Sequence, residues 1–134
     1  MSGWGAYCDR LTIDKGEFAV ILSLAGAIEA QSKDCPMSAK EIGEAFKALS
    51  DASMAINIKG KKLIKIVRTE EEIKAKASTA VCCIKKTKTI VLISGTYLDE
   101  NVPQNALEDK YNKLITLADY IISTVFKSTE SFIQ

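Results

Sequence analysis

Residues 54–94 decide the fold, and they read MAINIKGKKLIKIVRTEEEIKAKASTAVCCIKKTKTIVLIS. The stretch is rich in residues that favour strands, and short turn signals divide it, of which Lys59-Gly60 is the clearest. It predicts five strands, at residues 54–58, 61–68, 72–77, 80–85 and 89–94. The connections are too short for parallel crossovers, so we expect an antiparallel meander.

The segment before this stretch predicts a hairpin and then a helix. Two apolar runs, Phe18–Leu24 and Ala27–Gln31, are separated by Gly26, and glycine permits the positive φ of a tight turn. Ser38 can then cap a helix while Glu41, three residues on, completes a capping box. A helix is therefore predicted to start at Ser38.

Further helices are predicted at both ends of the chain. Near the start, apolar residues recur at helical spacing at Trp4, Tyr7, Cys8 and Leu11. A longer apolar stripe runs from Leu107 to Val125 and can begin at an Asn105 cap. The tail 127–134 loses this periodicity, and we expect it to be mobile. The class is thus α+β, an antiparallel sheet with helices on its faces.

Composition points to one domain over residues 1–134. The chain is 47% hydrophobic and 26% charged, with 18 basic and 17 acidic residues, which fits neither a disordered chain nor a polycationic nucleic-acid binder. The longest apolar run, Phe18–Ile28, is far shorter than the roughly 20 residues that cross a bilayer. No secretory signal is visible at the start, so a cytoplasmic location is favoured.

The residue types needed for common catalytic and metal sites are missing. The sequence has no histidine, which excludes the usual Ser-His-Asp and Cys-His catalysts and histidine-ligated zinc. Its four cysteines show no C-x-x-C spacing and are interpreted as reduced packing residues. Phosphate-binding glycine loops are also absent from the sequence. We therefore expect neither an enzyme nor a bound metal or cofactor.

Charge is distributed unevenly along the chain. Residues 59–88 carry ten of the 18 basic side chains and three acidic ones, giving +7 in this segment and −6 elsewhere. Such a segment attracts an acidic partner, and an acidic protein surface, phosphoinositide headgroups and nucleic acid are the candidates. Nucleic acid is disfavoured because the basic strands hold no aromatic residue to stack on bases. Alternatively, the lysines only keep exposed strands soluble.

Several short motifs together resemble the profilins, a family of small actin-monomer-binding proteins. Trp4-Gly5-Ala6-Tyr7 resembles the W-x-x-Y signature at the start of that family. Other segments that are similar, in the same order, are 27–32 (AIEAQS), 59–62 (KGKK), 84–87 (IKKT) and 118–121 (ADYI). The resemblance implies a profilin-like sheet with the N- and C-terminal helices on one face and a smaller helix on the other. High lysine and low glycine content would suit an early-branching or archaeal member of the Asgard type.

The resemblance also implies an actin-binding surface on the basic middle strands and the start of the last helix. The matching positions in this sequence are Lys62, Arg68, Lys74, Lys76, Asn112 and Thr116. Arg68 is a looser match, and the last two differ in residue type from the usual ones. Actin, as the family implies, presents an acidic region that a +7 segment would suit.

A second site implied by the resemblance binds polyproline through stacked aromatics. Four positions match it, namely Trp4, Tyr7, Tyr120 and Phe126. Glu29 stands where the family has an aromatic in the second strand, so polyproline binding is predicted to be weak or absent. The alternative is that Trp4 and Tyr7 only pack the terminal helices together.

The leading hypothesis is a cytoplasmic, cytoskeleton-associated monomer that binds globular actin and regulates filament assembly, with phosphoinositide headgroups as further partners. The alternative is a dimeric roadblock- or longin-like scaffold of small-GTPase machinery, since those families also surround a five-stranded antiparallel sheet with helices. An open apolar sheet edge or helix face would favour this alternative.

Overall fold

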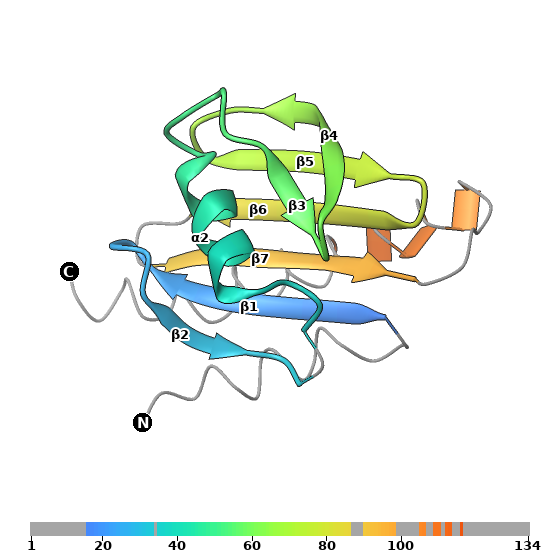
Figure 1. The fold of residues 1–134 in the computed structure, drawn as a ribbon, viewed down its shortest axis with the longest axis horizontal. Coiled ribbons are helices and arrows are strands. Elements are labelled where there is room, and N and C mark those ends of the chain that lie inside the picture. The colour runs from blue at the N-terminus through green and yellow to red at the C-terminus, as the bar shows by residue number, and fades with distance from the viewer. Residues whose placement is uncertain are drawn as a thin grey trace.

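The computed structural model describes residues 16–33, 35–86 and 90–98, together with positions 105, 106, 109, 110, 112, 113 and 116. Within this part of the chain, seven strands form one sheet in the order β2-β1-β7-β6-β5-β4-β3 (Figure 1). All neighbouring strands are antiparallel. The elements are β1 (Glu17–Ser23), β2 (Ile28–Gln31), α2 (Ala39–Lys47), β3 (Ile56–Ile58), β4 (Lys61–Arg68), β5 (Glu72–Ala77), β6 (Ala80–Lys86) and β7 (Ile90–Tyr97). The predicted hairpin, helix and meander are confirmed, with small shifts at the ends.

Strands β1 and β7 join the N-terminal hairpin to the meander. They pair along their whole length, with Phe18 opposite Gly95. A Cβ atom at position 95 would collide with the carbonyl oxygen of Val81 and lie 2.9 Å from Cζ of Phe18. The close approach of these strands therefore requires glycine at this position.

Helix α2 begins as the sequence predicts. The backbone N–H of Glu41 donates to Oγ of Ser38 at 3.2 Å, and the backbone N–H of Ser38 donates to Oε1 of Glu41 at 3.1 Å. This capping box satisfies two backbone donors that have no partner inside the helix. The helix lies across one face of the sheet (Figure 1) and buries Ile42 and Ala45 against it.

The core lies between α2 and this first face of the sheet. Each large side chain fully buried there contributes roughly 1.5–3 kcal/mol relative to an exposed one. The largest members of the cluster that are fully buried are Phe18, Leu22, Ile42, Ile56, Ile58, Leu63, Ile73, Ile84 and Ile93.

The terminal helices are described only in part. Asn105 and the other described positions as far as Thr116 are helical, which agrees with the predicted last helix. The helix predicted from Trp4, the tail 127–134 and the side of the sheet on which the terminal helices lie fall outside the described residues. No helix in the described part of the chain has the length and apolar character needed to cross a membrane.

Candidate protein-docking face

The two faces of β5 have opposite chemistry. Ile73 and Ala75 are buried in the core beneath α2. Lys74 and Lys76 alternate with them, so their side chains leave the strand on the second face of the sheet, away from α2. Both lysines are partly buried, as is common for lysines whose stems pack along a strand.

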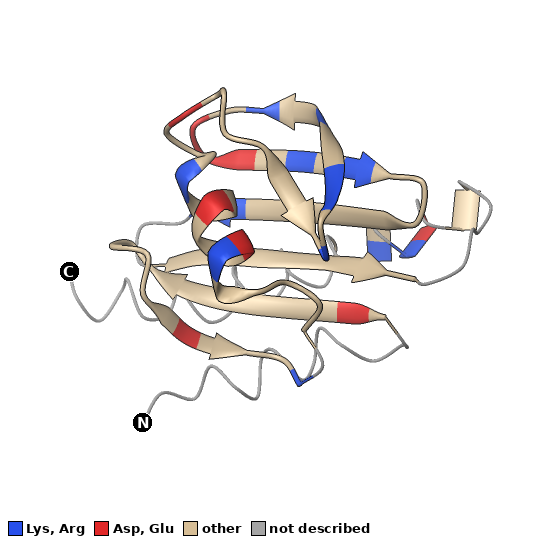
Figure 2. Cartoon of the chain, viewed as in Figure 1, with Lys and Arg blue, Asp and Glu red and all other residues tan. Residues whose placement is uncertain are grey.

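Strand β4 adds to this second face. Ile64 is directly opposite Lys76, and Val67 is directly opposite Lys74. Directly paired residues of antiparallel strands point to the same side. Lys62 precedes Ile64 by two residues, so it lies on that side as well. We call the surface formed by Lys62, Ile64, Val67, Lys74 and Lys76 the lysine face, and Figure 2 shows the basic residues gathered on β4 and β5.

Exposed apolar side chains lie on β4, and two of them, Ile64 and Val67, belong to the lysine face. Ile64 is 73% exposed, Ile66 is 58% exposed and Val67 is 38% exposed. Exposed apolar side chains surrounded by cationic ones are typical of surfaces that dock another protein. These residues were not predicted as site residues. Their signal in the sequence is the run Leu63 to Val67. Four of its five residues are apolar, and a strand that alternates between two faces cannot bury all of them on one face.

Arg68 does not lie on the lysine face. It is directly opposite Ile73 and points to the side of α2, where its Nη2 donates to the carbonyl oxygens of Ala48 and Leu49 at 3.2 Å each. The cause is a bulge between Lys65 and Val67, because one extra residue reverses the alternation of the strand. Arg68 thus holds the C-terminal end of α2 against β4.

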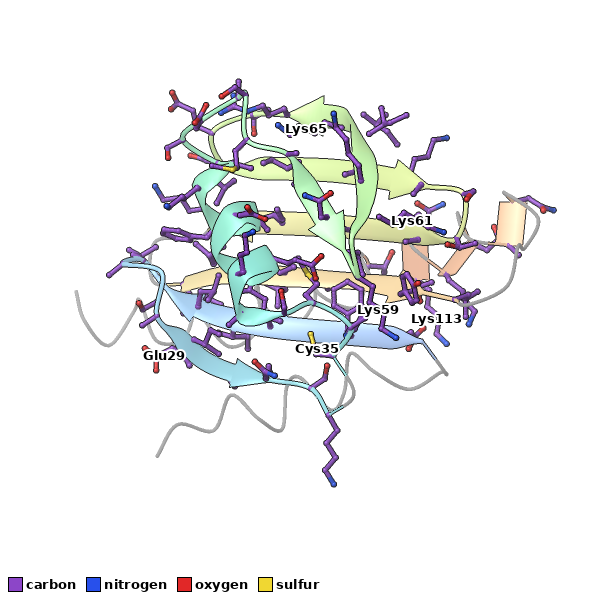
Figure 3. The ribbon with its side chains drawn as sticks, viewed as in Figure 1. Glu29, Cys35, Lys59, Lys61, Lys65 and Lys113 are labelled. Carbon is purple, nitrogen blue, oxygen red and sulfur yellow. The ribbon has the colours of Figure 1, made fainter. Side chains whose placement is uncertain are left out.

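Three other cations of the basic segment also make contacts within the molecule (Figure 3). Nζ of Lys59 lies 5.2 Å from the centre of the Tyr97 ring. Nζ of Lys61 donates to Oγ1 of Thr79 at 2.7 Å, and Nζ of Lys65 donates to the carbonyl oxygen of Ala52 at 2.8 Å. These lysines therefore brace the hairpin and loops around the sheet.

An ion pair lies at the β6 side of the second face. Nζ of Lys85 is 3.5 Å from Oε2 of Glu72, and the two residues are directly opposite each other on β6 and β5. This pair reduces the positive charge at that end of β5.

The remaining predicted site residues are placed only in part. Asn112 and Thr116 are helical and exposed. Trp4, Tyr7, Tyr120 and Phe126 lie outside the described residues. Glu29 is exposed on β2, at the edge of the sheet farthest from β3 (Figure 3).

The described thiols and carboxylates do not form a reactive centre. Burial raises the pKa of the Cys82 thiol far above its usual range, with smaller contributions from Cys83 and Cys35. Burial also raises the pKa of Cys35, and a backbone hydrogen bond with Met37 lowers it by less. Both thiols therefore stay protonated near neutral pH. Within the described ranges, no cluster of three or more cysteine, aspartate or glutamate residues could hold a metal ion.

The comparisons with known proteins agree with this geometry. The profilin family model matches residues 2–126. The chain belongs to the profilin family. The crystal structure of Schizosaccharomyces pombe profilin is similar, with 27% identity and a TM-score of 0.64 over 92% of this chain and 99% of that one. No curated protein sequence matches significantly.

Two more distant solved structures share the fold. Acanthamoeba castellanii profilin IA is 20% identical, with a TM-score of 0.64 over 91% of this chain and 98% of that one. Mouse profilin IIa, solved in complex with a double repeat from the FH1 domain of mDia1, is 17% identical, with a TM-score of 0.54 over 92% of this chain and 99% of that one.

Family membership has two direct consequences. Profilins are non-enzymatic proteins that bind actin and polyproline peptides, so this chain is assigned to a binding family and not to an enzyme family. The roadblock- or longin-like alternative has no support from the family match, although the exposed apolar residues of β4 were the feature expected to favour it.

Proposed function

We propose that this profilin binds monomeric actin through the lysine face and thereby regulates filament assembly. The observation that carries the proposal is the convergence of Lys62, Lys74 and Lys76 on one face around exposed Ile64 and Val67. The family supplies the partner, since profilins bind actin.

The physical role of the two kinds of side chain differs. The lysines attract an acidic surface over several ångströms and accelerate encounter, an effect that salt weakens. The apolar residues stabilise the complex once water is expelled from between the two surfaces. We propose that Arg68 does not contact actin, because its guanidinium group is directed to α2 on the other face.

The test is the spontaneous assembly of actin in the presence of increasing amounts of the protein. Binding of monomers should lengthen the lag phase and lower the amount of polymer, and the effect should weaken as salt is raised. Unchanged assembly at tens of micromolar protein, with cognate and with eukaryotic actin, would refute the proposal.

Phosphoinositide headgroups are a second proposed partner of the same surface. Lys62 is exposed and shares one face of the sheet with Lys74 and Lys76, and clustered lysines attract anionic headgroups by about 1 kcal/mol each near a membrane surface. Flotation with vesicles that contain or lack phosphoinositides tests this binding. Equal recovery on both vesicle types would exclude it.

Polyproline binding is proposed to be weak in this chain. The family binds such peptides, and mouse profilin IIa was solved with a repeat from an FH1 domain. Glu29 is exposed on β2 and stands where the resemblance implies an aromatic wall of that site. Fluorescence of Trp4 during titration with a proline-rich peptide tests this, and a tight saturable shift would contradict it.

We also propose that the protein is a monomer in the cytoplasm and associates with the cytoskeleton through actin. A dimer formed through the exposed apolar residues of β4 would cover the lysine face that we propose for actin. Mass measurement by sedimentation across the micromolar range distinguishes one chain from two.

A further inference from the structure

A cavity of about 510 Å³ lies at the C-terminal end of α2, on the opposite side of β4 from the lysine face. Its walls come from four separate parts of the chain: the β1–β2 turn, the end of α2 with the loop after it, the β4–β5 turn, and the end of β6. This volume is within the range of pockets that hold small molecules, roughly 300–1,000 Å³.

One wall is apolar. It is formed by Leu24, Phe46 and Leu49. The Phe46 ring packs against the β1–β2 turn so closely that a Cβ atom at Gly26 would lie 3.0 Å from Cε2. Leu24 is 44% exposed, so this wall presents apolar surface to whatever enters the cavity. An aromatic or aliphatic group would remove that surface from water.

The other wall is cationic. Arg68 and Lys86 line it together with one acid, Glu70, which leaves a formal excess of one positive charge. The Arg68 side chain is held in position by its hydrogen bonds to two carbonyls at the end of α2. It forms no ion pair with any carboxylate in the described part of the chain, and the nearby carboxylate of Asp51 is hydrogen-bonded to Ser53.

We propose that this cavity binds a small amphipathic anion. The apolar body of the ligand packs on Leu24, Phe46 and Leu49, and its single carboxylate, sulfonate or phosphate group lies between Arg68 and Lys86. A fixed guanidinium group is suited to such a head because its planar N–H groups match the oxygen atoms of these anions. The excess of one positive charge fits one negative charge on the ligand.

This site is separate from the actin proposal. The bulge in β4 directs Arg68 to the α2 side, whereas Val67, its neighbour, lies on the lysine face. The two surfaces can therefore be occupied together, and the binding of the anion does not depend on whether actin binds.

The test uses 8-anilinonaphthalene-1-sulfonate as the probe and 1-anilinonaphthalene, its neutral counterpart, for comparison. The sulfonate should bind one equivalent with enhanced fluorescence, and the backbone amide signals of Leu24, Phe46 and Leu49 should shift. The neutral compound should bind more weakly. Equal binding of both compounds, or shifts confined to β4 residues of the lysine face, would overturn the proposal.

Charge-reversal and blocking variants locate the site. Lys86→Glu should weaken sulfonate binding by roughly five- to tenfold, because a surface attraction becomes a repulsion. Lys33→Glu changes the net charge equally at an exposed position outside the cavity and should leave binding unchanged. Ala52→Trp fills the cavity from an exposed lining position and should abolish binding of both compounds. Equal affinity in Lys86→Glu and Lys33→Glu, or full binding in Ala52→Trp, would contradict the assignment.

Discussion

The carboxylate of Glu41 accepts a hydrogen bond from the backbone N–H of Gly60 at 2.9 Å. Its other oxygen, Oε1, accepts from the backbone N–H groups of Ser38 and Lys59, each at 3.1 Å. One side chain therefore joins the start of α2 to the turn between β3 and β4, although 19 residues separate Glu41 from Gly60. This contact positions the strand that presents Lys62.

The stability of the protein is predicted to depend on the charge of Glu41. Burial acts to raise the pKa of this carboxyl, but hydrogen bonds from Gly60, Ser38 and Lys59 outweigh it and hold the pKa below the usual value of 4.5. A lowered folded-state pKa adds stability above the unfolded-state pKa, and this stability is lost as the pH falls through the folded value. Glutamine keeps one oxygen acceptor and loses the other, so Glu41→Gln should be less stable than wild type at pH 7 by about 1 kcal/mol. The difference should shrink below pH 4.5.

Urea unfolding of both proteins between pH 7 and pH 3 measures this difference. Glu44→Gln is the matched control, because Glu44 is on the same helix and its carboxylate accepts no hydrogen bond from a described residue. The control should follow the wild type at each pH. A difference between wild type and Glu41→Gln that stayed constant over the whole range would show that charge plays no part.

Removal of the Arg68 guanidinium should reduce stability and leave actin binding intact. Arg68→Gln loses the hydrogen bonds to the carbonyls of Ala48 and Leu49, and we expect the free energy of unfolding to fall by about 1–3 kcal/mol. The dissociation constant for actin should change less than twofold at a temperature where the variant is folded. A large loss of affinity with unchanged stability would place Arg68 in the interface instead.

Two glycines should respond in opposite ways to alanine. Gly95→Ala places a methyl group against the Val81 carbonyl and 3.1 Å from the Cα of Cys82, so the β6–β7 pair must separate and we expect a loss of roughly 3 kcal/mol or more. Gly43 lies in α2 with open space around its Cβ direction. Gly43→Ala should stabilise the protein by about 0.5–1 kcal/mol. Thermal unfolding measures both, and equal effects would contradict the account of these sites.

Substitutions at two adjacent residues of β4 should affect the stability of the protein and its actin affinity separately. Ile64 is 73% exposed and Leu63 is 2% exposed, on opposite faces of the strand. Ile64→Ser should change stability by less than about 0.5 kcal/mol and weaken actin binding by roughly fivefold. Leu63→Ser should lower stability by roughly 2–5 kcal/mol. Chemical denaturation and an actin titration on both variants measure the two effects. Full actin affinity in Ile64→Ser would show that the apolar residues of the lysine face do not contribute to docking.

Local chemistry explains which parts of the fold could be predicted. The capping box at Ser38 and Glu41 and the hairpin turn at Gly60 depend on residues close in sequence, so their types are sufficient evidence. The pairing of Phe18 with Gly95 depends on a tertiary contact between distant segments, which no local pattern indicates. The hydrogen bond from Gly60 to Glu41 could not be predicted either, because it depends on how α2 lies over the sheet.

The bulge in β4 limits what could be predicted about the site. Strict alternation would place Lys62 and Arg68 on the same face, since they are six residues apart. The register shift after Lys65 moves Arg68 to the other side and creates the cationic wall of the cavity. Bulges arise from the packing of whole strands, so residue types alone do not locate them.

The most direct test of the central claim is the affinity of actin monomers for a charge-reversed lysine face. Lys62→Glu combined with Lys74→Glu should weaken binding at least tenfold at low salt, measured by fluorescence titration with labelled actin monomers. The control combines Lys33→Glu with Lys40→Glu, two exposed lysines away from that face, and carries the same net charge. Our account predicts that the control keeps the wild-type affinity. Equal affinity in both double variants would contradict it.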